Sequence, residues 1–178
     1  CDPDSLMGAL EAARLNLILP VLVGPVARIR ALASGLGEDI SDYRLVSTEH
    51  SHASAEAAVS LARSGEVDTL MKGSLHTDEI MAAVVSAQGG LRTERRVSHV
   101  FVMDVPAYDR ILFVTDAAIN IEPSLKEKAD IAQNAIDLAR SLGIETPKVA
   151  ILSAVEMVNP DINSTIDAAA LCKMADRG

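Results

Sequence analysis

Apolar residues follow helical and strand-like patterns in alternation through the first half of the chain. They recur at helical spacing in four stretches, which we expect to be helices: residues 5–17, 26–34, 53–63 and 77–88. Continuous apolar runs of strand length separate these stretches, at residues 18–23, 45–47 and 69–71. Because short strands and helices alternate, the pattern predicts a parallel sheet with right-handed crossover connections.

The second half begins with a break in composition at residues 91–96, where three arginines cluster. We place a domain boundary there, between residues 1–94 and 95–178. Apolar runs predict strands at residues 97–103 and 111–114. The polar loop between them is typical of a hairpin, so this pair is expected to be antiparallel.

The last third of the chain is predicted to hold two helices and one strand. Ser124 and Glu127 have the spacing of a capping box, and Gly143 ends the helix that this box opens. The inward residues of that helix are expected to be Ile131, Ala135, Leu138 and Leu142. A strand is predicted at residues 149–152. In the closing helix, residues 164–177, the expected inward residues are Ile166, Ala169, Ala170 and Met174.

Composition narrows the class of protein. Of the 178 residues 49% are hydrophobic and only 2% aromatic, so the core is aliphatic, as suits helices on a parallel sheet. The net charge of −9 argues against nucleic acid and anionic membranes as partners. There is no signal peptide, no bilayer-spanning run and no metal spacing or disulfide framework at Cys1 and Cys172, which favours a reducing cytoplasm. Because Cys1 is not an initiator and the last helix stops at Gly178, we expect a piece of a longer polypeptide.

Residues 68–79 are the most informative stretch, predicted as a buried strand, a tight polar turn and a helix start. Gly73 would let the backbone turn and come close to a ligand. Ser74 and Thr77 offer hydroxyls, and Thr77 can cap the helix. Lys72 and the helix N-terminus would lie at the carboxyl end of a strand, which suits a phosphate. The alternative is an ordinary strand-to-helix loop.

The histidines differ in how well they are placed for chemistry. His76 lies beside the predicted helix start and is the one expected to contact a ligand. His99 lies in an apolar run, where a hydrogen-bonded core histidine is the simpler interpretation. His50 and His52 share a turn, but no carboxylate triad or cysteine set accompanies them, which disfavours a metal.

Other polar residues allow two interpretations each. Several predicted strands end in polar residues, which is typical of a ligand cleft and also of simple strand ends: Ser47, Lys72, Asp104, Asp116 and Ser153. The arginines of the break can hold a phosphate or form a solvated loop, and the loop is favoured: Arg92, Arg95 and Arg96. No glycine-rich dinucleotide fingerprint follows a strand, and no Ser-His-Asp or paired-carboxylate site stands out.

Four separate runs resemble the phosphate acetyltransferase and phosphate butyryltransferase family. They are LMKGSLHT at 70–77, RRVSHVFVMDVP at 95–106, FVTDAAIN at 113–120 and PKVAILS at 147–153. The resemblance covers nearly the whole chain, and the Lys-Gly form of the first run is more similar to the butyryl branch. The chain looks most like the phosphotransacylase half of bifunctional proteins that carry an enoyl-CoA hydratase-like part in front.

The resemblance implies a three-layer α/β/α arrangement with a mostly parallel sheet. This is the two-domain fold of the isocitrate and isopropylmalate dehydrogenase type, incomplete in this chain and usually a homodimer or higher homo-oligomer. It implies reversible transfer of a short acyl group, acetyl or butyryl, between coenzyme A and phosphate, without a metal or redox cofactor. The residues it implies in contact with the acyl phosphate or lining the cleft are Lys72, Gly73, Ser74, His76, Thr77, Ser98, Asp116, Asn120 and Ser153.

The chain also departs from the family pattern. The family's Ser-Arg pair with a following aspartate does not occur, so the catalytic residues are expected beyond Gly178 and this chain alone is expected to be inactive. An arginine that the acetyl branch carries on the helix after the central loop is absent too. Two alternatives stay open: a non-catalytic acyl-CoA-sensing domain, of the kind found at the end of some malic enzymes, and a metal-dependent dehydrogenase on the same fold.

Overall fold

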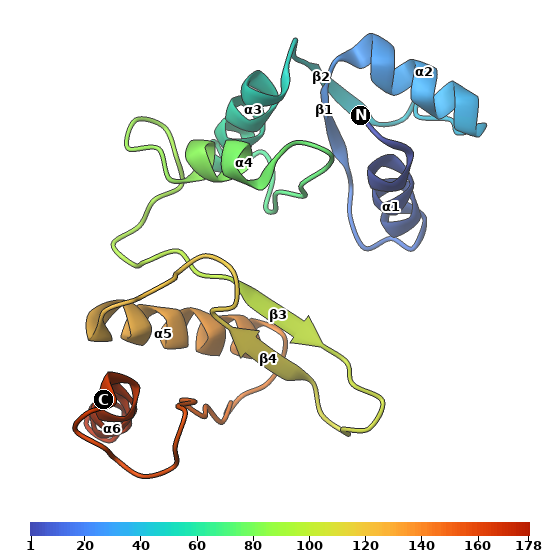
Figure 1. The fold of residues 1–178 in the computed structure, drawn as a ribbon. Helices are drawn as coiled ribbons and strands as arrows, with labels where there is room; N and C mark the ends of the chain where they lie inside the picture. Colours follow the sequence, from blue (N-terminus) through green and yellow to red (C-terminus); the bar gives the residue numbers. More distant parts are fainter. The chain divides into compact units, whose positions relative to one another are not determined.

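The computed structural model describes residues 1–178 and divides into two compact units, Cys1–Arg92 and Thr93–Gly178 (Figure 1). Each unit holds one two-stranded sheet and its own helices. The sheets are therefore small, one a parallel pair and the other antiparallel, and the broad parallel sheet implied by the resemblance is not formed. The assignment of residues 1–94 and 95–178 to two domains stays a prediction. None of the helices combines the length and apolar character needed to cross a membrane.

The first unit arranges four helices with a parallel pair of strands. Its elements in chain order are α1 (Pro3–Arg14), β1 (Val21–Gly24), α2 (Val26–Leu36), β2 (Arg44–Ser47), α3 (Ser51–Arg63) and α4 (Thr77–Val84). The strands pair from Val21 with Arg44 to Gly24 with Ser47, which confirms a parallel connection through α2. Helices α1 and α2 pack together, and α3 packs against α4 (Figure 1).

The core of this unit is aliphatic, as the composition predicts. It joins one face of α1 to one face of α2, and its buried members are Leu6, Leu10, Ile29, Ala33 and Ile40. Caps fix the ends of both helices. Asp2 accepts a hydrogen bond from the backbone N–H of Ser5 (2.9 Å), and Gly37 ends α2 with a φ of +73°, a left-handed conformation that favours glycine.

The strand predicted at residues 69–71 is wrong. A strand exists through its backbone hydrogen bonds to a neighbour, and this segment pairs with neither β1 nor β2. Met71 lies against α1 instead, where its Cε is 3.7 Å from the position that a β-carbon on Gly8 would take. The apolar run that suggested a buried strand is therefore not buried, since Thr69 is exposed and 62% of Met71 is exposed.

Two element ends in this unit also differ from the prediction. Thr77 is not the cap of α4 but its first helical residue, and His76 holds the N-cap position. The strand predicted at residues 18–23 begins only at Val21, directly after Pro20. Proline has no N–H to donate to a ladder, so it suits the position before a strand better than one inside it.

The second unit contains an antiparallel hairpin and two helices. In chain order these are β3 (Val100–Met103), β4 (Leu112–Thr115), α5 (Leu125–Ser141) and α6 (Asn163–Ala175). The strands pair from Val100 with Thr115 to Met103 with Leu112, which confirms the predicted hairpin. Helix α5 packs on β4, and α6 packs on α5.

The predicted start of α5 is confirmed, and so is its end, because Gly143 follows the C-cap with a φ of +89°, a conformation that favours glycine. The predicted burial of Leu142 is wrong. Ser124 and Glu127 form the capping box, with the Glu127 carboxylate accepting a hydrogen bond from the Ser124 N–H at 2.9 Å. At the other end Leu142 is the C-cap, where the chain leaves the helix, and 54% of it is exposed. Ala139 is buried in its place.

Two further expectations for this unit are wrong. Residues 149–152 pair with neither β3 nor β4 and form no strand. Helix α6 buries Thr165 and Leu171 instead of the predicted face. The predicted inward residues that are exposed are Ile166, Ala169 and Met174. Thr165 can be buried because its hydroxyl is satisfied by the backbone N–H and carbonyl oxygen of Asn159, each at 2.9 Å.

Candidate functional site

The loop of residues 72–76 leads into α4 and presents polar groups to solvent. Lys72 is exposed, and its ammonium donates one hydrogen bond, to the carbonyl oxygen of Gly73 at 3.1 Å. Ser74 is exposed as well, and its Oγ accepts a hydrogen bond from the amine of Cys1 at 3.1 Å. An exposed ammonium with spare donors, two residues from an exposed hydroxyl, is able to bind an anion such as a phosphate.

Gly73 lies beside the start of α1. A β-carbon on Gly73 would lie 3.6 Å from the Cβ and the Oγ of Ser5, which is ordinary van der Waals contact. Its φ is outside the left-handed region, so the turn predicted at Gly73 does not depend on the conformational freedom of glycine. Close approach of a ligand to the backbone is the remaining reason for a glycine at this position.

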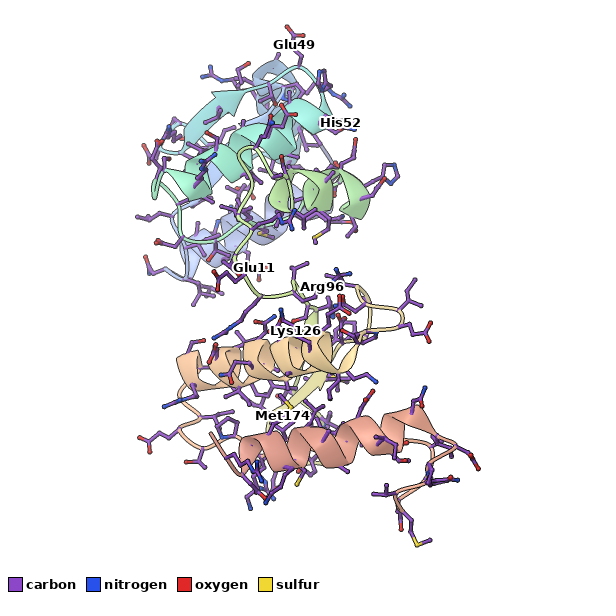
Figure 2. The ribbon with its side chains drawn as sticks, turned by 90° about the vertical axis from the view of Figure 1, so that its left-hand side faces the viewer. Glu11, Glu49, His52, Arg96, Lys126 and Met174 are labelled. Carbon is purple, nitrogen blue, oxygen red and sulfur yellow. The ribbon has the colours of Figure 1, made fainter.

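The carboxylate of Glu79 joins the starts of α3 and α4. Its Oε2 accepts a hydrogen bond from the backbone N–H of His76 at 2.8 Å. Its Oε1 accepts a hydrogen bond from the hydroxyl of Ser51 and lies 3.1 Å from Nδ1 of His52. The Glu79 side chain is only 11% exposed, whereas that of His52, which Figure 2 labels, is 70% exposed.

These donors hold the pKa of Glu79 below its usual value. The hydroxyl of Ser51 contributes most and the N–H of His76 next, and together they outweigh burial, which acts in the opposite direction. Sequence reasoning missed Glu79 as part of the candidate site. A signal was present, because Glu79 stands three residues after His76, the spacing of a capping box with histidine in place of the usual Ser or Thr.

His50 and His52 stand at the start of α3 and have separate structural roles. His50 is the N-cap, and its Nδ1 accepts a hydrogen bond from the backbone N–H of Ala53 at 3.2 Å. The two imidazole rings meet edge to face, with centroids 6.3 Å apart. The structure contains no group of three or more His, Cys, Asp or Glu side chains that could hold a metal ion.

In the second unit, the loop after β4 is organised by the carboxylate of Asp116. Its Oδ1 accepts hydrogen bonds from the backbone N–H groups of Ala118 and Ile119, both at 3.1 Å. Its Oδ2 accepts from the backbone N–H of Asn120 at 3.2 Å and from the side-chain amide of the same residue. Burial, the largest single influence, raises the pKa of Asp116, but the hydrogen bonds together outweigh it and hold this pKa below its usual value.

Asn120 connects this loop to the segment before β3. Its Oδ1 accepts a hydrogen bond from Nε of Arg96 at 2.7 Å. Ser98 belongs to the same region, because the side-chain amide of Asn134 on α5 donates both to the Arg96 carbonyl oxygen (2.8 Å) and to Ser98 Oγ (2.9 Å). The structure thus brings three of the predicted cleft residues, Ser98, Asp116 and Asn120, into one hydrogen-bond network.

The arginines before β3 pair with carboxylates of α5. Arg95 Nη1 lies 2.5 Å from Oδ2 of Asp137, and Arg96 Nη1 lies 3.4 Å from Oε1 of Glu127. Both arginine side chains are about half exposed, and Figure 2 shows Arg96 near α5. The contacts tie this segment to α5, which favours the solvated loop over a phosphate site.

The side chains of Ser153 and His99 make no hydrogen bond to that network. The Oγ of Ser153 shares a hydrogen bond with the Oγ of Ser164 at 2.7 Å. The ring of His99 packs edge-on against Phe101, with centroids 4.4 Å apart. Its buried Nδ1 has no hydrogen-bond partner, so the expectation of a hydrogen-bonded core histidine is wrong at that atom. The ligand roles of all nine predicted site residues stay predictions.

Solved structures share the fold of this chain. A phosphotransacetylase from Streptococcus pyogenes matches with a TM-score of 0.78 at 20% sequence identity, over 99% of this chain and 63% of that one. A branched-chain phosphotransacylase from Enterococcus faecalis V583 matches with a TM-score of 0.69 at 25% identity, over 88% of this chain and 64% of that one. The α/β fold described above thus corresponds to part of each of these proteins.

Sequence comparison gives the family. The chain is 58% identical to a phosphate acetyltransferase of Rhizobium meliloti, over 100% of this chain and 56% of that protein. It is 40% identical to a phosphate butyryltransferase of Clostridium acetobutylicum, over 99% of this chain and 59% of that protein. The chain therefore spans about half the length of the curated relatives it matches. A family model described as "Phosphate acetyl/butaryl transferase" matches residues 48–178, and the chain belongs to this family.

Proposed function

We propose that the protein containing this chain transfers a short acyl group, acetyl or butyryl, reversibly between coenzyme A and inorganic phosphate. The family match over residues 48–178 carries the proposal. Relatives named for the acetyl and the butyryl reaction both align along nearly the whole chain, which supports the reaction class and leaves the acyl group open. We further propose that the protein is a cytoplasmic homodimer or higher homo-oligomer.

The reaction makes three physical demands. Cations and N–H donors must hold the phosphate, a base must take the proton of the coenzyme A thiol, and donors must meet the carbonyl oxygen as negative charge develops there. We assign the first demand to the loop of residues 72–76 with Thr77, since the Lys72 ammonium and the Ser74 hydroxyl are both exposed. The thiol base is expected beyond Gly178, so this chain alone is expected to be inactive.

The cleft residues of the second unit fall into two groups. We propose that Ser98, Asn120 and Ser153 line the cleft. Asp116 was expected to line it too, but its carboxylate already accepts four hydrogen bonds from its own loop. We therefore propose that Asp116 acts through Asn120, whose side chain it holds in place.

The experiment that tests this function is acylation of coenzyme A by the full-length gene product, using a panel of acyl phosphates. Turnover establishes the transferase, and the preferred chain length separates the acetyl from the butyryl reaction. The absence of turnover with every acyl phosphate, together with retained acyl-CoA binding, would contradict the proposal and favour a sensor.

Lys72→Ala is expected to raise the KM for phosphate of the full-length enzyme by about ten- to a hundredfold, because it removes a charge-assisted hydrogen-bond donor. Steady-state kinetics with phosphate as the varied substrate measure this. Lys126→Ala is the matched control, since Lys126 is an exposed lysine at the start of α5 (Figure 2) and is expected to leave this KM unchanged. An unchanged KM in Lys72→Ala would remove Lys72 from the site.

Gly73→Ala is expected to raise the same KM several-fold while leaving the melting temperature within about 2 °C of the wild-type value. The reason is that the added methyl group meets only ordinary contacts in the protein but would obstruct a ligand at the backbone. Thermal unfolding and kinetics on one preparation measure both quantities. Gly37→Ala should give the opposite result, a lower melting temperature and an unchanged KM, because Gly37 has a φ of +73°.

A further inference from the structure

The loop of residues 72–76 is held at both ends by contacts outside itself. Near its start, Gly73 lies beside Ser5 of α1, whose Oγ is 3.6 Å from the position that a β-carbon on Gly73 would take. At its end, the backbone N–H of His76 donates to Glu79. Lys72 directly precedes the first of these points and Ser74 lies between them. Both side chains are exposed, so their positions depend on how firmly the loop is fixed.

The Glu79 carboxylate that accepts from His76 also contacts residues of a second helix. The second oxygen of Glu79 accepts a hydrogen bond from Ser51 and lies 3.1 Å from Nδ1 of His52, both on α3. The carboxylate is thus an internal anion between the N-termini of α3 and α4, where helix dipoles and unpaired N–H groups favour negative charge. Because α3 packs along α4, this one side chain fixes the end of the loop to a second helix.

We propose that Glu79 is a positioning residue for the phosphate-binding loop, acting through His76 and anchored by Ser51 and His52. This inference rests on the proposed function of that loop. It assigns to Glu79 no contact with substrate. Its role is to hold the loop in a binding geometry, so its loss should weaken ground-state binding of phosphate more than it slows the chemical step.

Kinetics of full-length variants test the proposal. We expect Glu79→Ala to raise the KM for phosphate by about tenfold with kcat changed less than about threefold. Glu79→Gln, which keeps a hydrogen-bond acceptor but loses the charge, should fall between Glu79→Ala and wild type. Asp78→Ala is the matched control, because Asp78 is an exposed acid in the same first turn with no side-chain partner and is expected to leave both constants unchanged.

A second readout separates this proposal from the proposed function. Hydrogen exchange of the His76 amide, followed by NMR, should accelerate about tenfold in Glu79→Ala and stay unchanged in Asp78→Ala. If the wild-type protein shows no acyl transfer, the proposed function fails, and the affinity for inorganic phosphate measured by chemical-shift changes replaces KM. Unchanged phosphate affinity in Glu79→Ala, or an equal effect of Asp78→Ala, would overturn the role of Glu79.

Discussion

Leu10→Ala is expected to lower the free energy of unfolding of the Cys1–Arg92 unit by about 3 kcal/mol, because it removes buried methyl groups and leaves a cavity. Leu10 is only 1% exposed and lies in the cluster that joins α1 to α2. Urea unfolding measures this, with the fluorescence of Tyr43 as the probe. Tyr43 packs against the cluster, and a Tyr108→Phe background leaves it as the one fluorescent side chain, since the chain has two tyrosines and no tryptophan.

The matched control is Leu17→Ala, the same substitution just after α1. Leu17 is 70% exposed, so its loss is expected to change the free energy of unfolding by less than about 0.5 kcal/mol. Equal effects of the two substitutions would show that the cluster around Leu10 is not the stabilising core. An effect of Leu10→Ala below that of the control would do the same.

Local signals predicted the helices well because the physics that starts and ends a helix is itself local. The Ser124–Glu127 box and Gly143 each act within a few residues, and both are where the sequence places them. The apolar runs at residues 69–71 and 149–152 contain no local signal that decides whether they form strands. A strand depends on hydrogen bonds to a neighbour far away in the sequence, and neither run has that neighbour in this structure.

The buried face of α6 could not be predicted either, and the reason is different. Apolar and small residues occur all round this helix, so its sequence favours no single face. The burial of Thr165 was decided instead by the turn before the helix, where Asn159 satisfies its hydroxyl. A polar residue at a buried position is visible only once its partner is known.

In the candidate site, too, groups that are close in sequence could be predicted together, whereas contacts between distant residues could not. The loop of residues 72–76 is contiguous, so its polar residues could be recognised together from sequence. The contact between Glu79 and Ser51 spans 28 residues of chain, and no local pattern predicts it. In the second unit Asp116 and Asn120 are predicted as site residues, yet only the structure shows that one holds the other.

Asp116→Ala is expected to destabilise the Thr93–Gly178 unit by about 2 kcal/mol at neutral pH. The substitution deprives three backbone N–H groups and the Asn120 amide of their acceptor, and unmade hydrogen bonds of this kind cost more than made ones contribute. Hydrogen exchange of the Ile119 and Asn120 amides should accelerate with it. Asp109→Ala, an exposed aspartate in the loop between β3 and β4, is the control and is expected to change neither stability nor exchange.

The effect of Asp116→Ala should depend on pH in a fixed direction. The folded-state pKa of Asp116 lies below its unfolded value, so its stabilising contribution is complete above the unfolded pKa of about 4. It is lost as the pH falls through the folded pKa, because protonation weakens the carboxylate as an acceptor. The difference in unfolding free energy between wild type and Asp116→Ala should therefore be constant from about pH 5 to 8 and shrink below about pH 4. A difference that grows on acidification would mean that the carboxylate destabilises this loop, and the hydrogen bonds around Asp116 could not then hold Asn120 in place.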